Sequence, residues 1–249
     1  MRTSTTTPKQ TSIWIQKVTR WKDDLLHLIY PDLCLICNQE LTRNSISICP
    51  ICDSDLKFTF FENFTEPTAL DQLFWGRVPL ASTCAFLHFQ QESSTQEILH
   101  AIKYKGKKEL ALAMGRRFGE KLTSNSAKFG HIQALIPVPL HPKKQFIRGY
   151  NQSEMIAHGI AETLGAEVIT DLLTKGKHTD SQTKKNKFMR WDNVSEVFVV
   201  DTSKYTHLQH IALVDDVVTT GSTLEAAIQK ILEVMPHIQV TVLSLAIAK

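Results

Sequence analysis

Short apolar runs alternate with amphipathic segments along most of this chain. Runs rich in Val, Ile and Leu predict strands at 81–89, 132–140, 167–170, 194–200, 211–216 and 239–248. Between them, apolar residues recur at the spacing of one helix face and predict helices at 95–104, 108–122, 151–165 and 224–235. Strands that alternate with helices in this way favour an α/β fold with a doubly wound, mostly parallel sheet.

Polar residues and a glycine at helix ends indicate where two of these predicted helices begin or end. Asn151 is a suitable N-cap for the helix at 151–165, and Gly165 suits its C-terminal end. Ser222 followed by Glu225 has the spacing of a capping box, so we expect Ser222 to cap the helix that follows it.

The N-terminal part of the chain has a different pattern and predicts a separate domain. Apolar residues at helical spacing predict a helix over 13–29, which Pro31 ends. Four cysteines and a Phe-rich stretch follow. We therefore expect an N-terminal module at 1–65 and an α/β domain at 66–249.

The four cysteines predict a closed metal site. Cys34 and Cys37 form one C-x2-C pair, Cys49 and Cys52 form another, and residues 38–48 separate them. Each such turn directs two thiolates inward, and two turns complete a tetrahedron around structural Zn2+. The alternative is a group of buried or redox-active thiols. Cys84 lies inside a predicted strand without a partner and is interpreted as a core residue.

Composition and charge argue against some classes of protein but do not indicate a particular function. The chain has 249 residues, 43% of them hydrophobic, and a net charge of +3, which is too small to indicate a nucleic-acid partner. No uncharged apolar run is long enough for a membrane span, and the N-terminus lacks the apolar core of a signal peptide. We expect a cytoplasmic protein.

Residues 211–223 carry the clearest chemistry. An apolar run leads into Asp215 and Asp216, and a Thr/Gly/Ser segment then opens a helix. Free N–H groups and the dipole at a helix start suit a phosphate, while adjacent carboxylates accept hydrogen bonds from vicinal hydroxyls. The pattern thus indicates a ribose 5-phosphate site. The plainer alternative is a capped helix next to two solvated aspartates.

This stretch resembles the binding motif for 5-phosphoribosyl 1-diphosphate (PRPP) in type I phosphoribosyltransferases. The resemblance implies that Asp215 and Asp216 hold the ribose hydroxyls and that the segment 219–223 cradles the 5-phosphate. That segment consists of Thr219, Thr220, Gly221, Ser222 and Thr223.

Further segments resemble the ComF (competence protein F, ComFC/GntX-like) family over about residues 25–249. They are 102–111, 137–157 and the spacing of residues 182–198, together with the two cysteine pairs. The resemblance implies a phosphoribosyltransferase-like domain, with Lys103, Pro139 and Arg148 near the diphosphate and Mg2+ bound with PRPP. The polar segment 174–193 would be a lid that carries Arg190, although lysines stand where comparable members have arginines.

The sequence is compatible with three functions. The favoured one is a PRPP-dependent phosphoribosyltransferase with an unidentified acceptor. A second is a non-catalytic PRPP or nucleotide sensor of the competence and recombination machinery, acting with DNA-uptake proteins. A third is an accessory protein that binds single-stranded DNA through the basic strip 103–121.

Overall fold

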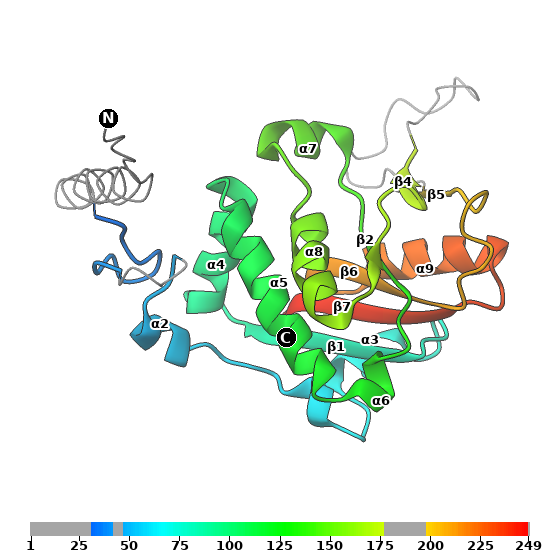
Figure 1. Cartoon of the computed structure of the whole chain (residues 1–249), viewed down its shortest axis with the longest axis horizontal. Coiled ribbons are helices and arrows are strands. Elements are labelled where there is room, and N and C mark those ends of the chain that lie inside the picture. The colour runs from blue at the N-terminus through cyan, green and yellow to red at the C-terminus, as the bar shows by residue number, and fades with distance from the viewer. Residues whose placement is uncertain (1–30, 42–46, 177–197, 249) are drawn as a thin grey trace, which may run out of the picture. The chain divides into compact units, whose positions relative to one another are not determined.

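A computed structural model describes residues 31–41, 47–176 and 198–248 (Figure 1). The contacts divide the chain into two compact units, residues 1–54 and 55–249. The helix predicted over 13–29 and the segment 177–197, which includes Arg190, lie outside the described residues. Within the described ranges, no helix combines the length and apolar character that crossing a membrane requires.

The described part of the smaller unit is built from tight turns around its cysteines. Leu33 and Glu40 form an antiparallel bridge, and the N–H of Cys34 donates to the carbonyl of Gln39 at 2.7 Å. In the second cysteine pair, Cys49 directly precedes the short helix α2 (Pro50–Ser54) and Cys52 lies within it. These backbone bonds fold both cysteine pairs into turns that bring their sulfurs together.

A five-stranded parallel sheet forms the centre of the larger unit and confirms the predicted α/β fold. Its strand order is β1-β7-β6-β2-β3, and every pairing within it is parallel. The strands are β1 (Ser82–Phe89), β7 (Gln239–Ala248), β6 (His210–Val218), β2 (Ala134–Pro137) and β3 (Glu167–Val168). Strands β6 and β7 are almost wholly buried, as strands covered on both faces should be.

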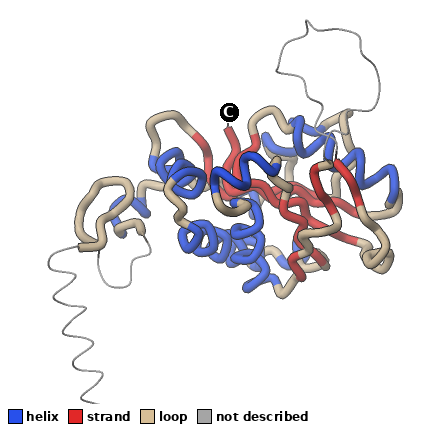
Figure 2. Tube along the Cα trace, turned by 90° about the horizontal axis from the view of Figure 1, so that it is seen from above, coloured by secondary structure: helices blue, strands red, loops and turns tan. Residues whose placement is uncertain are grey.

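Helices cover both faces of this sheet (Figure 2). The helices of the larger unit are α3 (Ala69–Phe74), α4 (Ser94–Tyr104), α5 (Lys108–Thr123), α6 (Ser126–Phe129), α7 (Pro142–Arg148), α8 (Gln152–Leu164) and α9 (Ser222–Val234), with a 3-10 turn at Phe61–Asn63. The chain steps from β2 to β3 through α8 and from β6 to β7 through α9. These steps run in opposite directions along the sheet, so right-handed crossovers put α8 and α9 on opposite faces.

The structure also departs from the predicted strands. The strand predicted to reach residue 140 ends at Pro137, and α7 follows it. The strand predicted to end at Asp216 continues to Val218 because it stays paired with β7. A separate antiparallel pair, β4 (Leu173–Lys175) and β5 (Phe198–Val200), precedes β6.

Helices α5 and α8 lie side by side, as Figure 1 shows, and pack against each other at glycine contacts. Gly115 and Gly119 on α5 and Gly159 on α8 leave no room for a side chain. A Cβ at Gly159 would lie 2.1 Å from the carbonyl oxygen of Leu112. Because the two backbones approach so closely, the position of α8 depends directly on that of α5.

Candidate functional site

The four paired cysteines form a cluster that can hold a metal ion such as zinc. All four sulfurs lie within 4.8 Å of one another, and those of Cys37 and Cys49 are 3.6 Å apart. A tetrahedral ion with Zn–S bonds of about 2.3 Å requires sulfur separations of about 3.8 Å. Three of the four side chains are buried, which suits a closed structural site rather than one open to substrate.

Backbone donors in this cluster favour a thiolate at Cys34, whereas burial raises the pKa of Cys52. The N–H of Cys49 points at the sulfur of Cys34 at 3.3 Å, and the N–H of Cys52 points at the sulfur of Cys49 at 3.4 Å. Burial opposes ionisation of Cys34, but N–H groups from Cys37, Cys49 and Ile36 lower its pKa to about 6. The cluster can therefore supply a thiolate near neutral pH, the form that binds a metal.

In the larger unit, the predicted ligand residues lie between strands β2 and β6, where the connections to the next strand begin to run in opposite directions along the sheet. Strands β2 and β6 are neighbours, and their following helices α8 and α9 leave toward opposite faces. Pro137 pairs with Val214, so β2 ends level with Asp215, and β6 continues three residues further. Ligands of open α/β sheets bind at such a switch point, outside the carboxyl ends of the strands.

The two aspartates at the end of β6 have different partners. Asp215 accepts a hydrogen bond from the Ser153 hydroxyl at 3.1 Å and one from the N–H of Asp216 at 2.8 Å. Asp216 is buried, and its carboxylate lies 3.1 Å from the Nζ of Lys103. Burial and then the charge of Asp216 raise the pKa of Asp215 to about 7. The pair therefore combines an ion-paired carboxylate with one that holds its proton more tightly than usual.

The Thr/Gly/Ser segment forms a turn beside these carboxylates. A small cavity is lined by Asp215 and by residues 217–224. Gly221 has φ of 75° and is the N-cap of α9, without a side-chain capping bond. The hydroxyls of Thr220 and Ser222 lie 3.0 Å apart. Backbone N–H groups at the start of α9 and several hydroxyls thus share one concave surface, which suits an anion.

The predicted capping box at Ser222 is wrong. Ser222 is the first residue of α9, and the carboxylate of Glu225 binds the guanidinium of Arg77 instead. A charge-assisted bond to arginine is stronger than a bond to a neutral backbone N–H, so it determines where Glu225 points. The hydroxyl of Ser222 is consequently not used to cap its own helix.

Three further predicted residues border the same edge of the sheet. Lys103 at the end of α4 reaches Asp216, as described above. Pro139 is half-buried in the turn after β2, and the Asn151 side chain donates to the neighbouring Val138 carbonyl at 3.1 Å. Arg148 binds Gln152 at 2.8 Å and lies over the ring of Tyr104, 5.4 Å from its centroid. Arg190 lies outside the described residues.

Two residues of the site were missed by sequence reasoning. Ser153 donates to Asp215 and lies in the first turn of α8, whose N-cap is the predicted Asn151. Its position at the start of a helix is the one sequence feature that could indicate a role in ligand binding. Arg77 donates to the Thr220 carbonyl at 2.9 Å across 143 positions of sequence. No local pattern around Arg77 indicates that contact.

The raised pKa of Asp215 predicts a pH dependence of stability. A carboxyl whose folded pKa lies above its unfolded value of 3.8 stabilises the fold fully below that value, and the contribution disappears as pH rises through about 7. Asp215→Asn, which mimics the neutral acid, should therefore gain stability relative to wild type at about pH 8 but not at about pH 4. Urea unfolding of both proteins at the two pH values measures this difference; an equal difference at both would contradict it.

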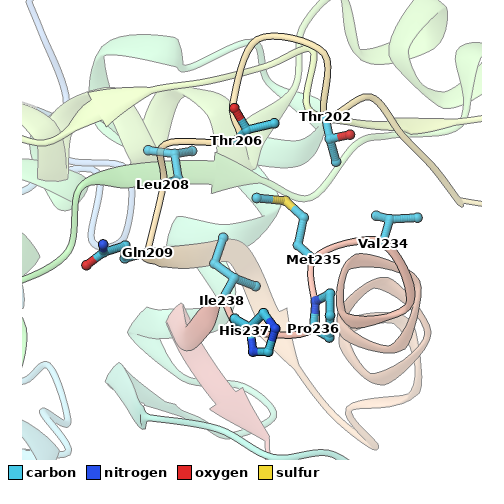
Figure 3. A pocket seen from close by; sticks show the side chains of 9 residues that line it. All are labelled: Thr202, Thr206, Leu208, Gln209, Val234, Met235, Pro236, His237 and Ile238. Atoms are coloured by element: carbon cyan, nitrogen blue, oxygen red, sulfur yellow. The ribbon is translucent and has the colours of Figure 1, made fainter.

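A second cavity, of about 350 Å3, lies at the opposite edge of the sheet (Figure 3). Leu208 and Gln209 precede β6 there, and His237 and Ile238 precede β7. It is larger than the hollow beside Asp215. However, it lies at the amino ends of these strands, and its lining includes no carboxylate. We therefore place the candidate ligand site at the carboxyl ends.

Comparisons with known proteins reveal relatives, although no family model matches the chain. Competence protein F of Haemophilus influenzae is 37% identical over 93 residues, which cover 37% of this chain and 41% of that protein. DNA utilization protein YhgH of Salmonella typhimurium is 25% identical over 82% of this chain and 92% of its own length. Competence protein ComFC of Bacillus subtilis is 24% identical over 84% of this chain and 82% of its own length.

The three alignments complement one another. The first has the higher identity but spans less than half of competence protein F. The other two extend over most of both chains, and the fold is the α/β architecture that the ComF resemblance implied. The names and alignments of these relatives support the resemblance to the ComF family that the sequence motifs carry.

Proposed function

We propose that the larger unit binds PRPP and transfers its 5-phosphoribosyl group. The observation that carries this proposal is the placement of Asp215 and Asp216 at the switch point, beside the turn 219–223. Carboxylates for a ribose diol and a helix start for its 5-phosphate lie at one edge of the sheet. A structural turn would not need a buried carboxylate held by Lys103.

In this proposal each group has a defined task. Asp215 and Asp216 accept hydrogen bonds from the ribose hydroxyls, and residues 219–223 hold the 5-phosphate. The bond from the anomeric carbon to the diphosphate breaks while an acceptor nitrogen forms a new bond to that carbon. Lys103 and Arg148 offer positive charge to the departing diphosphate, and Pro139 lies in the turn that would face it.

Two parts of the proposal lie beyond the described geometry. Mg2+ bound with PRPP would supply charge neutralisation of the diphosphate. The segment 174–193, with Arg190, would close over the site as a lid. The relatives' names, competence protein and DNA utilization protein, lead us to place this activity in DNA uptake.

Isothermal titration with PRPP and Mg2+ tests the proposal. We expect micromolar binding by wild type and at least tenfold weaker binding by Asp215→Asn/Asp216→Asn, since each lost ionic hydrogen bond contributes roughly 1.5–3 kcal/mol. Asp171→Asn is the control, because Asp171 is an exposed carboxylate paired with Lys204 at 3.0 Å. Pyrophosphate release with purine, pyrimidine or amine acceptors then tests transfer.

The outcomes separate binding from chemistry. Failure of folded wild type to bind PRPP would overturn the proposal. Binding without release of pyrophosphate in any acceptor screen would support the PRPP-sensing alternative instead.

A second candidate function, contact with single-stranded DNA, is favoured by the surface of α7. Phe146 and Ile147 are 90% and 78% exposed, and the exposed Lys143 and Lys144 lie beside them on a helix without acidic residues. Exposed rings next to basic groups are the elements that bind unpaired bases and phosphates. By contrast, Arg116 of the strip 103–121 is paired with Glu162.

Anisotropy of labelled oligothymidylate measures this second function. We expect Lys143→Ala/Lys144→Ala to weaken binding and to reduce the slope of log affinity against log salt by about 1.4, since each phosphate contact on a single strand accounts for about 0.7. Lys230→Ala, which removes a half-exposed lysine from α9, should change neither quantity. Binding by wild type that does not vary with salt would exclude a phosphate-contacting surface.

A further inference from the structure

Arg77 joins the segment after α3 to the turn 219–223. Its Nη1 donates to the carbonyl of Leu73 at 2.8 Å and to the carbonyl of Thr220 at 2.9 Å. Its Nη2 binds the carboxylate of Glu225 in the first turns of α9. One guanidinium therefore links α3, the turn and α9.

The ring of Phe74 packs against the same turn at Gly221. A Cβ at Gly221 would lie 3.0 Å and 3.1 Å from two atoms of that ring, and 3.7 Å from the Nη1 of Arg77. Phe74 is itself buried. Phe74 thus provides the apolar contact of the turn, and Arg77 makes the polar contacts.

The bond from Arg77 to Thr220 has a geometric consequence for the anion site. In a trans peptide the carbonyl and the following N–H point in opposite directions. Because the Thr220 carbonyl points toward Arg77, the N–H of Gly221 points away from Arg77. A carbonyl that turned to the other side would present a negative dipole to a phosphate in place of a donor.

The bond to Glu225 has a second consequence, which is electrostatic. Glu225 lies near the start of α9, where its negative charge would oppose a bound phosphate. Arg77 neutralises this charge through a contact in which the two side chains are 31% and 24% exposed. Partial burial limits screening by solvent, so the pairing matters more than an ion pair on the open surface.

We propose that Arg77 is a positioning residue for the 5-phosphate, which it serves by orienting the Thr220–Gly221 peptide and by neutralising Glu225. This inference rests on the proposed PRPP site. Arg77 itself need not touch the ligand. Its effect should be confined to the phosphate end of the site, because Asp215, Asp216 and Lys103 are held by other contacts.

Titration of Arg77→Gln with two probes tests the inference. PRPP with Mg2+ should bind about tenfold more weakly than to wild type, as expected when a hydrogen bond to a charged group is lost. Inorganic pyrophosphate with Mg2+, which lacks the 5-phosphate, should bind with affinity unchanged within about twofold. The ratio of the two affinities is a readout that a general loss of structure would not shift.

Two further variants separate the contributions of Arg77. Arg77→Lys keeps the charge but lacks the planar fork that binds Thr220 and Glu225 together, so it should restore only part of the PRPP affinity. Adding Glu225→Gln to Arg77→Gln should recover affinity if the uncompensated carboxylate is part of the loss. Arg116→Gln is the matched control, since Arg116 forms an Arg–Glu pair with Glu162 between α5 and α8.

The outcomes distinguish this inference from the proposed function. If wild type does not bind PRPP, both fail. If wild type binds PRPP and Arg77→Gln, with an unchanged melting temperature, binds it equally well, only the role of Arg77 is overturned. Equal weakening of PRPP and pyrophosphate would also overturn it, because the effect would then not be local.

Discussion

Gly159→Ala should destabilise the larger unit by roughly 3 kcal/mol, despite the higher helix propensity of alanine. The added Cβ would lie 2.1 Å from the Leu112 carbonyl oxygen and 2.6 Å from the Arg116 nitrogen. Both obstacles are backbone atoms of α5, so no side-chain rotation can relieve the clash. The helices would have to separate, and α8 would lose buried contacts along its length.

The same substitution should also affect ligand binding, because the start of α8 contacts the candidate site. Ser153 binds Asp215, and Asn151 binds the carbonyl of Val138 after β2. Displacement of α8 should therefore weaken PRPP binding as well as stability. Calorimetry and PRPP titration measure the two effects, with an expected fall in melting temperature of about 6–12 °C.

Glu162→Ala provides the control for this prediction. It removes an ion pair with Arg116 between the same two helices, a half-exposed contact that should contribute less than about 1 kcal/mol. Equal melting temperatures for Gly159→Ala and wild type would mean that the helices do not pack at the glycine contact.

Loss of metal from the cysteine cluster should unfold the smaller unit while the larger unit stays folded. We expect one zinc ion per chain in wild type and none in Cys52→Ser. A structural zinc site contributes on the order of 10 kcal/mol to folding, more than so small a unit can supply from apolar burial. The four sulfurs within 4.8 Å of one another carry this expectation.

Elemental analysis and limited proteolysis measure the result. Residues 31–54 should become sensitive to protease in Cys52→Ser and in chelator-treated wild type. Cys84→Ser is the control, because Cys84 is buried in β1 and lies outside the cluster, so this variant should keep its zinc. Wild type without zinc, or Cys52→Ser with a full complement, would contradict the prediction.

The sequence by itself determined the type of fold and the positions of the clustered cysteines. Alternating apolar runs and amphipathic segments predict a parallel α/β sheet because the periods of strand and helix differ, and the predicted strand 239–248 coincides with β7. Paired cysteines likewise identify a cluster that can hold a metal ion, because both halves of each ligand pair are local in sequence. These are features that neighbouring residues specify.

Tertiary structure alone decided how distant residues complete the site. The partners of Asp215 and Asp216 are Ser153 and Lys103, which come from different helices. Glu225 has the local spacing of a capping residue, yet it binds Arg77 because folding brings a guanidinium beside it. Local propensity ranks the options of one segment, whereas a charge-assisted contact across the fold is stronger and determines which option is taken.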